Sequence, residues 1–210
     1  MNPRHILALV PIALAGSVGP ALAHHAMGGE TPDTLATGLL SGLGHPVIGI
    51  DHLAFVIAVG LAAAFTSRRL LSPLAFVAAT VAGCLLHVAG SVLPAAEILI
   101  AASILLLGGI VLSGRRTGTP ALLGLFAIAG LFHGWAYGAS IVGAEPTPLI
   151  AYLAGFSLIQ YAIAAGSGYL ALRVWNAADQ RAVHPRLAGA VVAGIGLTFL
   201  IENLEGLLLA

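Results

Sequence analysis

The chain has 210 residues, of which 59% are hydrophobic and only 8% are charged, and its formal net charge at pH 7 is zero. So few polar side chains cannot cover the surface of a soluble globule, and the mean hydropathy of +1.03 therefore indicates a polytopic membrane protein. Every basic residue is arginine or histidine. The absence of lysine argues against direct ATP use through a P-loop and against a retinal Schiff base. The sequence also has no basic patch, so a nucleic-acid partner is not expected.

The N-terminal segment combines Arg4, an apolar run and the small-residue pattern Ala21-Leu22-Ala23. These three features are typical of a secretory signal peptide. We therefore expect cleavage after Ala23 and a mature chain that begins at His24. The alternative is an uncleaved first span, which the short apolar run, broken by Pro11, disfavours.

Six later segments are apolar and long enough to cross roughly 30 Å of hydrocarbon. They cover residues 46–65, 71–93, 95–112, 120–139, 147–170 and 187–208. The predicted fold class is therefore all-α: a polytopic membrane helical bundle of six transmembrane helices after a cleaved signal peptide. With residues 1–23 as the signal peptide, residues 24–210 are expected to form a single transmembrane domain.

The arginines of the mature chain indicate its orientation. They all lie in the first, third and fifth connections between the predicted spans: Arg68, Arg69, Arg115, Arg116, Arg173, Arg181 and Arg186. The positive-inside rule assigns these connections to the cytoplasm. The sequence thus predicts a multi-pass protein of the bacterial inner membrane with both mature termini in the periplasm.

Ionisable side chains from several predicted spans fall at one depth. At about 1.5 Å per helical residue, six of them lie in the outer third of the bilayer: Asp51, His52, His87, Glu97, His133 and Glu202. Such side chains are costly in hydrocarbon and usually mark a pathway or a ligand. The alternative is that ionisable side chains simply lie near helix ends, where burying them costs less free energy than at the bilayer midplane. The near absence of ionisable groups in the inner third favours a shared outer site.

The segment His45-Pro46-Val47-Ile48-Gly49-Ile50-Asp51-His52 is the most specific signal. Pro46 suits the first position of a helix, which would make His45 a cap at the membrane surface. His45 and His52 would then stand about 10 Å apart along a regular helix, too far to hold one ion unless the backbone deforms near Gly49. We expect His45 to be an entrance ligand and Asp51 with His52 to form a deeper site, unless Asp51 only orients an imidazole.

Other polar groups have simpler interpretations. His87 and His184 are expected to form hydrogen bonds between helices, and Cys84, the only cysteine, is expected to pack without a disulfide or a Cys-rich metal cage. Gly130, Gly134 and Gly138 predict close helix packing beside His133. Whether His87, Cys84, Glu202 or the N-terminal pair His24-His25 binds metal stays open.

Three stretches resemble the HupE/UreJ family of nickel and cobalt permeases associated with hydrogenase and urease maturation. They are Gly44 to Leu53 followed by Ala58-Val59-Gly60, Phe132 to Gly138, and Leu93-Pro94 followed by Glu97. The resemblance implies an inner-membrane carrier with His45, Asp51, His52, Glu97 and His133 as its metal-binding positions. Family members often carry a second His or a Glu where this chain has Tyr137 and Ala139-Ser140, so metal preference is expected to differ.

The sequence therefore predicts a secondary permease that imports a divalent transition metal, Ni²⁺ or Co²⁺, without enzymatic activity or a prosthetic cofactor. Imidazole and carboxylate suit these ions, while Met1 and Met27 are the only methionines, which argues against copper(I). Two alternatives are a membrane metalloprotein that holds a fixed ion without transport, and a proton-conducting channel. Nickel against cobalt preference, proton coupling and oligomeric state are left open.

Overall fold

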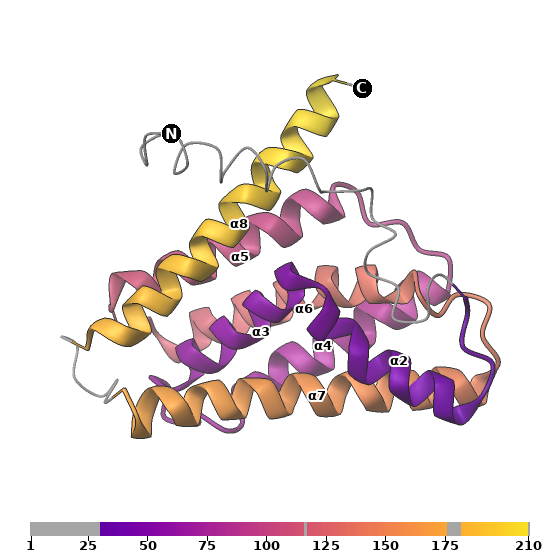
Figure 1. Cartoon of the computed structure of the whole chain (residues 1–210), viewed down its shortest axis with the longest axis horizontal. Coiled ribbons are helices and arrows are strands. Elements are labelled where there is room, and N and C mark those ends of the chain that lie inside the picture. Colours follow the sequence, from indigo (N-terminus) through magenta and orange to yellow (C-terminus); the bar gives the residue numbers. More distant parts are fainter. Residues whose placement is uncertain (1–29, 116, 176–181, 210) are drawn as a thin grey trace, which may run out of the picture.

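A computed structural model describes residues 30–115, 117–175 and 182–209 of the chain. Over these residues the fold is entirely helical, as predicted, and it has seven α-helices where six were expected (Figure 1). The helices are α2 (Leu35–Ile48), α3 (Ile50–Ala63), α4 (Pro73–Val88), α5 (Ala96–Ser113), α6 (Thr119–Gly138), α7 (Pro146–Arg173) and α8 (Val183–Leu209). The predicted signal peptide and the pair His24-His25 lie outside the described residues.

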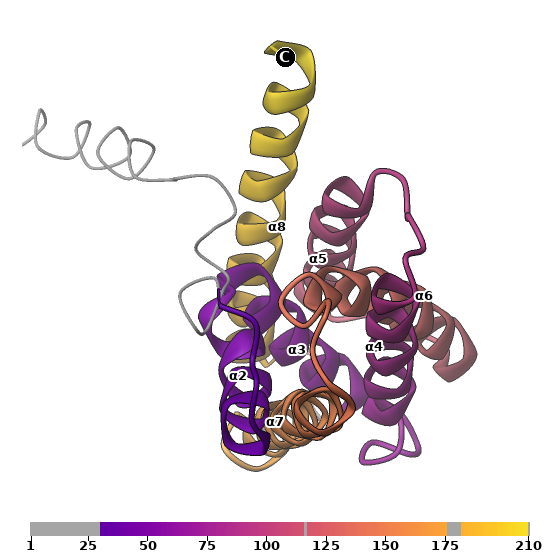
Figure 2. The ribbon, with the colours of Figure 1, turned by 90° about the vertical axis from the view of Figure 1, so that its right-hand side faces the viewer.

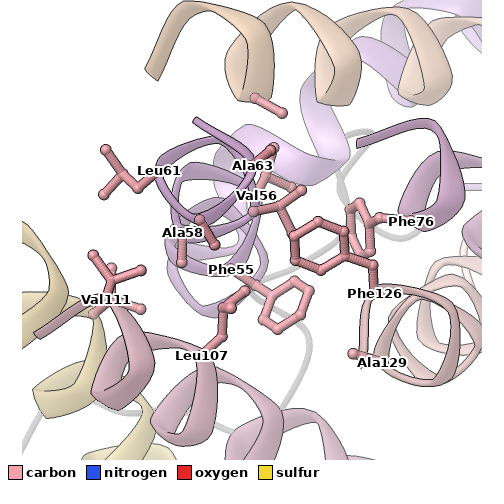
Figure 3. Packing of buried hydrophobic residues seen from close by; sticks show 14 of the residues in the cluster. Phe55, Val56, Ala58, Leu61, Ala63, Phe76, Leu107, Val111, Phe126 and Ala129 are labelled. Atoms are coloured by element: carbon pink, nitrogen blue, oxygen red, sulfur yellow. The ribbon is translucent and has the colours of Figure 1, made fainter. Parts of the chain in front are cut away.

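Helix α3 lies at the centre of the bundle, and the other six helices surround it (Figure 2). Its sequence is almost entirely apolar, and most of its side chains are buried. Phe55 packs against Phe76 of α4, and Phe126 of α6 belongs to the same buried cluster (Figure 3). A helix that is hydrophobic on all sides is one that other helices enclose, so the sequence of α3 accounts for its position.

Close backbone contacts join the most extensive helix pairs, which are α4 with α6, α5 with α8 and α2 with α7. A Cβ atom at Gly134 would collide with the backbone of Thr80, and one at Gly42 would collide with the carbonyl of Tyr152. Small residues let helix backbones approach in this way. The predicted packing role of Gly130, Gly134 and Gly138 is confirmed, because all three face α4.

The first predicted span is wrong in its start and its shape. The chain turns by 81° between α2 and α3 at Gly49, whose backbone is extended (φ −73°, ψ 105°). Pro46 lies inside α2 and His45 in its last turn, so His45 is buried and is not a surface cap. The physical reason is that a capping box between Thr34 and Thr37 already starts a helix at Leu35, well before Pro46.

The membrane spans agree with the prediction in part. Helices α5, α6, α7 and α8 are each long and apolar enough to cross a bilayer, and α2 with α3 passes the same test only as a bent pair. Helix α4 is apolar but has 16 residues, which is about 24 Å of helix. Six complete spans therefore stay a prediction.

Candidate metal site

The break at Gly49 brings together groups that a straight helix would separate. The last turn of α2 carries His45, and the first turn of α3 carries Asp51 and His52. All three side chains are buried, and the ring centroids of His45 and His52 lie 5.9 Å apart. The 81° turn is thus the backbone deformation near Gly49 that was expected to be necessary if these two imidazoles were to approach one another.

His133 of α6 also belongs to this cluster. It is fully buried, and its Nδ1 atom lies 2.9 Å from Nδ1 of His52. Its ring centroid lies 4.4 Å from that of Phe55 and 5.9 Å from that of Phe76. Aromatic rings therefore wall the inner side of the cluster and exclude water from the pair of imidazoles.

A serine on α5 fixes the hydrogens of both imidazoles. Ser103 donates its single hydroxyl hydrogen to the carbonyl of Ile100 at 2.7 Å, and its Oγ lies 3.1 Å from Nε2 of His133. The hydroxyl can only accept at His133, so His133 carries its hydrogen on Nε2. Nδ1 of a neutral His133 is then an acceptor, and His52 must donate from its own Nδ1. The lone pair of a neutral His52 consequently lies on Nε2.

A tyrosine on α7 fixes His45 by the same logic. Tyr152 donates its hydroxyl hydrogen to the carbonyl of Tyr137 at 2.9 Å and lies 2.9 Å from Nδ1 of His45. Since the hydroxyl has no second hydrogen, Nδ1 of His45 is the donor in this contact. In a neutral His45, as in His52, the lone pair therefore lies on Nε2, and a metal ion would bind through that nitrogen.

Asp51 supplies the negative charge of the cluster. Its Oδ2 atom lies 3.9 Å from Nε2 of His52. Two tetrahedral ligands that each bind an ion at about 2.1 Å are about 3.4 Å apart, so this pair could share a cation only after a small inward movement. A side chain at position 49 would crowd both groups, because its Cβ would lie 2.9 Å from Cδ2 of His52 and 3.0 Å from Oδ1 of Asp51.

Glu97 stands at the edge of the cluster. It lies in the first turn of α5 and is exposed. A small cavity of about 10 Å³ separates it from Asp51, with Asn203 of α8 also on its wall. That volume holds about one water molecule, so Glu97 borders the approach to Asp51 and is not part of the buried cluster.

The structure thus brings together His45, Asp51, His52 and His133 and leaves Glu97 at their rim. Within the described ranges, no group of three His, Cys, Asp or Glu side chains is close enough to hold a metal ion as it stands. Coordination by three of these side chains therefore requires them to move inward around an ion.

The sequence did not identify three residues that shape this site. Ser103 and Tyr152 set the hydrogens of the imidazoles, and the ring of Tyr137 packs against both His45 and His52, with centroid distances of 4.7 and 4.6 Å. The motif from Phe132 to Gly138 gave one signal for Tyr137. A single serine or tyrosine in an apolar helix gives none.

The predictions for the remaining polar residues hold for two of three. His87 donates from Nδ1 to the carbonyl of Trp135 at 2.7 Å, which confirms its predicted hydrogen bond between helices. His184 instead stacks on Trp175 with centroids 6.2 Å apart and forms no hydrogen bond with a described residue. Cys84 is fully buried against α6 and α7 as a packing residue.

A second buried polar group lies deeper in the bundle. Thr80 Oγ1 lies 2.8 Å from the carbonyl oxygen of Val77 and 3.0 Å from a terminal atom of the Gln160 carboxamide. One hydroxyl hydrogen cannot serve two acceptors, so the carboxamide must donate its NH₂ to Thr80. Its oxygen then faces the Tyr137 hydroxyl, which is its other hydrogen-bonding neighbour. This orientation satisfies both the Gln160 nitrogen and the Tyr137 hydroxyl, which are otherwise buried without a partner among the described residues.

The fold and the site define a membrane protein of apolar helices that encloses a cluster of imidazoles and one carboxylate. The family model described as HupE / UreJ protein matches residues 12–199, and the chain belongs to this family. It is 32% identical over 199 residues to Protein HupE of Rhizobium leguminosarum bv. viciae, covering 91% of this chain and 97% of that protein. No solved structure is significantly similar to the chain.

Proposed function

We propose that this protein is a secondary permease that imports Ni²⁺ or Co²⁺ across the bacterial inner membrane. The observation that carries the proposal is the buried cluster of two imidazoles and one carboxylate, in which Nε2 of His52 lies 3.9 Å from Oδ2 of Asp51 and the ring centroids of His45 and His52 lie 5.9 Å apart. Imidazole nitrogen with carboxylate oxygen is a donor set that suits divalent nickel, cobalt and zinc. Membership of the HupE/UreJ family, which is associated with nickel and cobalt uptake, supports the same reading.

Each residue of the cluster has a distinct role in this proposal. His45, Asp51 and His52 bind the ion, and Glu97 attracts it at the entrance. His133 acts as a positioning residue, because both of its ring nitrogens are occupied by His52 and Ser103. Partners of this kind hold a ligating imidazole in one tautomer and one orientation. His133 becomes a direct ligand only if the ion displaces one of these hydrogen bonds.

The membrane potential supplies enough energy for uptake without ATP. With the arginine-rich connections in the cytoplasm, the cluster opens toward the periplasm and both mature termini lie on that side. A divalent ion that moves inward along an inside-negative potential gains about 4.6 kcal/mol per 100 mV. A prosthetic cofactor and an enzymatic step are not needed for this process.

The deeper polar groups favour release over retention. The buried polar side chains that adjoin the imidazoles are Tyr137 and, beyond it, Gln160 and Thr80, which are neutral oxygen and amide groups. Such groups bind nickel or cobalt more weakly than imidazole with carboxylate. An ion that leaves the cluster is therefore passed to weaker ligands on the way to the cytoplasm.

The decisive measurement is accumulation of radiolabelled nickel and cobalt in cells that lack other importers. Wild type should accumulate metal, while His52→Ala and Asp51→Asn should reduce uptake to background at equal protein levels. His184→Ala is the matched control, because this imidazole is exposed and lies outside the cluster. Equal uptake in wild type and both site variants would falsify the assignment of the site.

Flux in proteoliposomes separates the permease from its alternatives. A carrier moves metal into vesicles when an inside-negative potential is imposed. A fixed structural ion would instead remain bound in stoichiometric amounts through chelation, with no flux. A proton channel would conduct in the absence of metal, so a pH-sensitive current without metal would contradict the proposal.

A further inference from the structure

A sizeable cavity lies far from the imidazole cluster. It has a volume of about 480 Å³ and lies at the C-terminal end of α3, whereas His52 lies near the N-terminal end of that helix. Its walls come from Ala64, from the connection between α3 and α4, and from the last three turns of α7. Pockets of this size commonly hold a small molecule or part of a larger one.

Two guanidinium groups line this cavity from separate elements. Arg69 belongs to the connection after α3, and Arg173 is the last residue of α7. Among the described residues, no acidic side chain lines the cavity, and neither arginine forms an ion pair. Two positive charges at one cavity would repel a metal cation, so this cavity does not suit the exit of the proposed substrate. It suits an anion.

The rest of the lining is apolar. Leu70, Leu172 and Ala165 contribute hydrocarbon surface, and Tyr169 is exposed beside them. Tyrosine is enriched where the bilayer meets water, and arginine pairs with phosphate through two parallel hydrogen bonds. A free phosphate would use the two arginines but leave the apolar wall unoccupied, whereas a phospholipid uses both.

We propose that this cavity binds the headgroup and upper acyl chains of an anionic phospholipid, through Arg69, Arg173 and the apolar wall. The positive-inside rule assigns both arginines to the cytoplasmic leaflet, where basic pockets between transmembrane helices bind anionic lipid headgroups. The lipid joins the connection after α3 to the end of α7 and so braces the inner end of the central helix. The inference is independent of metal transport.

Native mass spectrometry of the full chain in detergent tests the proposal. During titration with phosphatidylglycerol or phosphatidylcholine, wild type should retain one phosphatidylglycerol and at least tenfold less phosphatidylcholine. The double variant Arg69→Gln/Arg173→Gln should bind phosphatidylglycerol about 30-fold more weakly, since each arginine near an anionic headgroup contributes about one kcal/mol. Arg68→Gln is the matched control, because Arg68 adjoins Arg69 but does not line the cavity.

A second variant separates loss of charge from loss of space. Ala165→Phe keeps both arginines and fills the cavity, so it should also lose the lipid while its thermal unfolding temperature stays within a few degrees of wild type. Equal retention of the two lipids, or equal weakening by Arg68→Gln and the double variant, would overturn the proposal. Displacement of phosphatidylglycerol by millimolar inorganic phosphate, or full retention by Ala165→Phe, would assign the cavity to a free anion and also overturn it.

Discussion

The Nδ1 atoms of His52 and His133 lie 2.9 Å apart, so one of these imidazoles donates to the other. Ser103 determines which imidazole is the donor, because its hydroxyl donates to the carbonyl of Ile100 and accepts a hydrogen bond from His133. A hydroxyl on α5 thus determines which nitrogen of His52, on α3, can bind an ion.

We therefore expect Ser103→Ala to weaken metal binding without removing any ligand. Without the hydroxyl, His133 has no acceptor for its Nε2 hydrogen and the order of donors in the chain is lost. Loss of such an outer partner typically costs about 10- to 100-fold in metal affinity. The KM of nickel or cobalt uptake should rise by that factor, while the maximal rate at saturating metal changes less.

Two variants control this experiment. Ser103→Thr keeps a hydroxyl and should restore most of the affinity. Ser113→Ala removes a serine that makes the equivalent bond to Ile110 on the same helix but is exposed, and it should leave the KM unchanged. If Ser103→Ala and Ser113→Ala behave alike, the serine has no part in orienting the imidazoles.

Tyr152 has the same relationship to His45, which yields a second prediction. In Tyr152→Phe the Nδ1 hydrogen of His45 loses its buried acceptor, so the ring is free to turn its lone pair away from the site. We expect the KM of uptake to rise by about 10-fold or more. Tyr161→Phe is the control on the same helix, because the Tyr161 hydroxyl donates to the carbonyl of Leu70 outside the cluster. A rise of equal size in both variants would point to a general effect on α7.

Hydropathy alone predicted most of the fold. The predicted segments 95–112, 120–139, 147–170 and 187–208 differ by a few residues from α5, α6, α7 and α8, because long apolar runs leave no other structure open in a bilayer. Helix α2 was missed because its glycine, serine and threonine residues lower its hydropathy. Those glycines instead let α2 lie directly against α7, as Gly42 does at Tyr152.

The candidate site was predictable in its ionisable residues and not in their supports. His45, Asp51, His52 and His133 stand out because such side chains are rare in an apolar sequence. The 81° turn at Gly49 was foreseen only as a condition for His45 and His52 to share an ion. Ser103 and Tyr152 act on the imidazoles only because of the helices that pack against them. A single sequence does not show which helices face one another.

Gly49 carries the third prediction. In Gly49→Ala the new Cβ would press on Cδ2 of His52 and Oδ1 of Asp51, at 2.9 and 3.0 Å, so both proposed ligands must shift. We expect uptake to fall at least 10-fold at low metal concentration, since small displacements of a positioned group are costly. Gly166→Ala is the control, because its Cβ meets nothing within 4 Å in the middle of α7. Unchanged uptake in Gly49→Ala would show that the ligands tolerate displacement.

Uptake should depend on external pH with a defined sign. Imidazole binds metal only in its neutral form and ordinarily gains a proton near pH 6 to 7. Uptake should therefore be highest at and above neutral pH and fall as the external pH drops through about 6. Initial rates at constant free metal and a potential clamped with valinomycin and potassium measure this directly. Rates that increase on acidification would instead indicate that protons drive the transport.

The inferred orientation of the Gln160 carboxamide gives the last prediction. If its oxygen accepts from the Tyr137 hydroxyl, Tyr137→Phe and Gln160→Leu remove the same hydrogen bond, and their effects on stability are not additive. A double-mutant cycle on the free energy of unfolding should give a coupling of about 1 kcal/mol, the usual net value of one such bond.

Thr80→Val tests the other end of the same carboxamide. Gln160 should couple to Thr80 as well as to Tyr137, because its NH₂ donates to the Thr80 hydroxyl while its oxygen accepts from the tyrosine. Tyr137 and Thr80, which share no hydrogen bond, should couple only in the presence of Gln160. A coupling between Tyr137 and Gln160 near zero would mean that these two side chains share no hydrogen bond, and it would contradict the inferred orientation. A coupling between Gln160 and Thr80 near zero would contradict it as well.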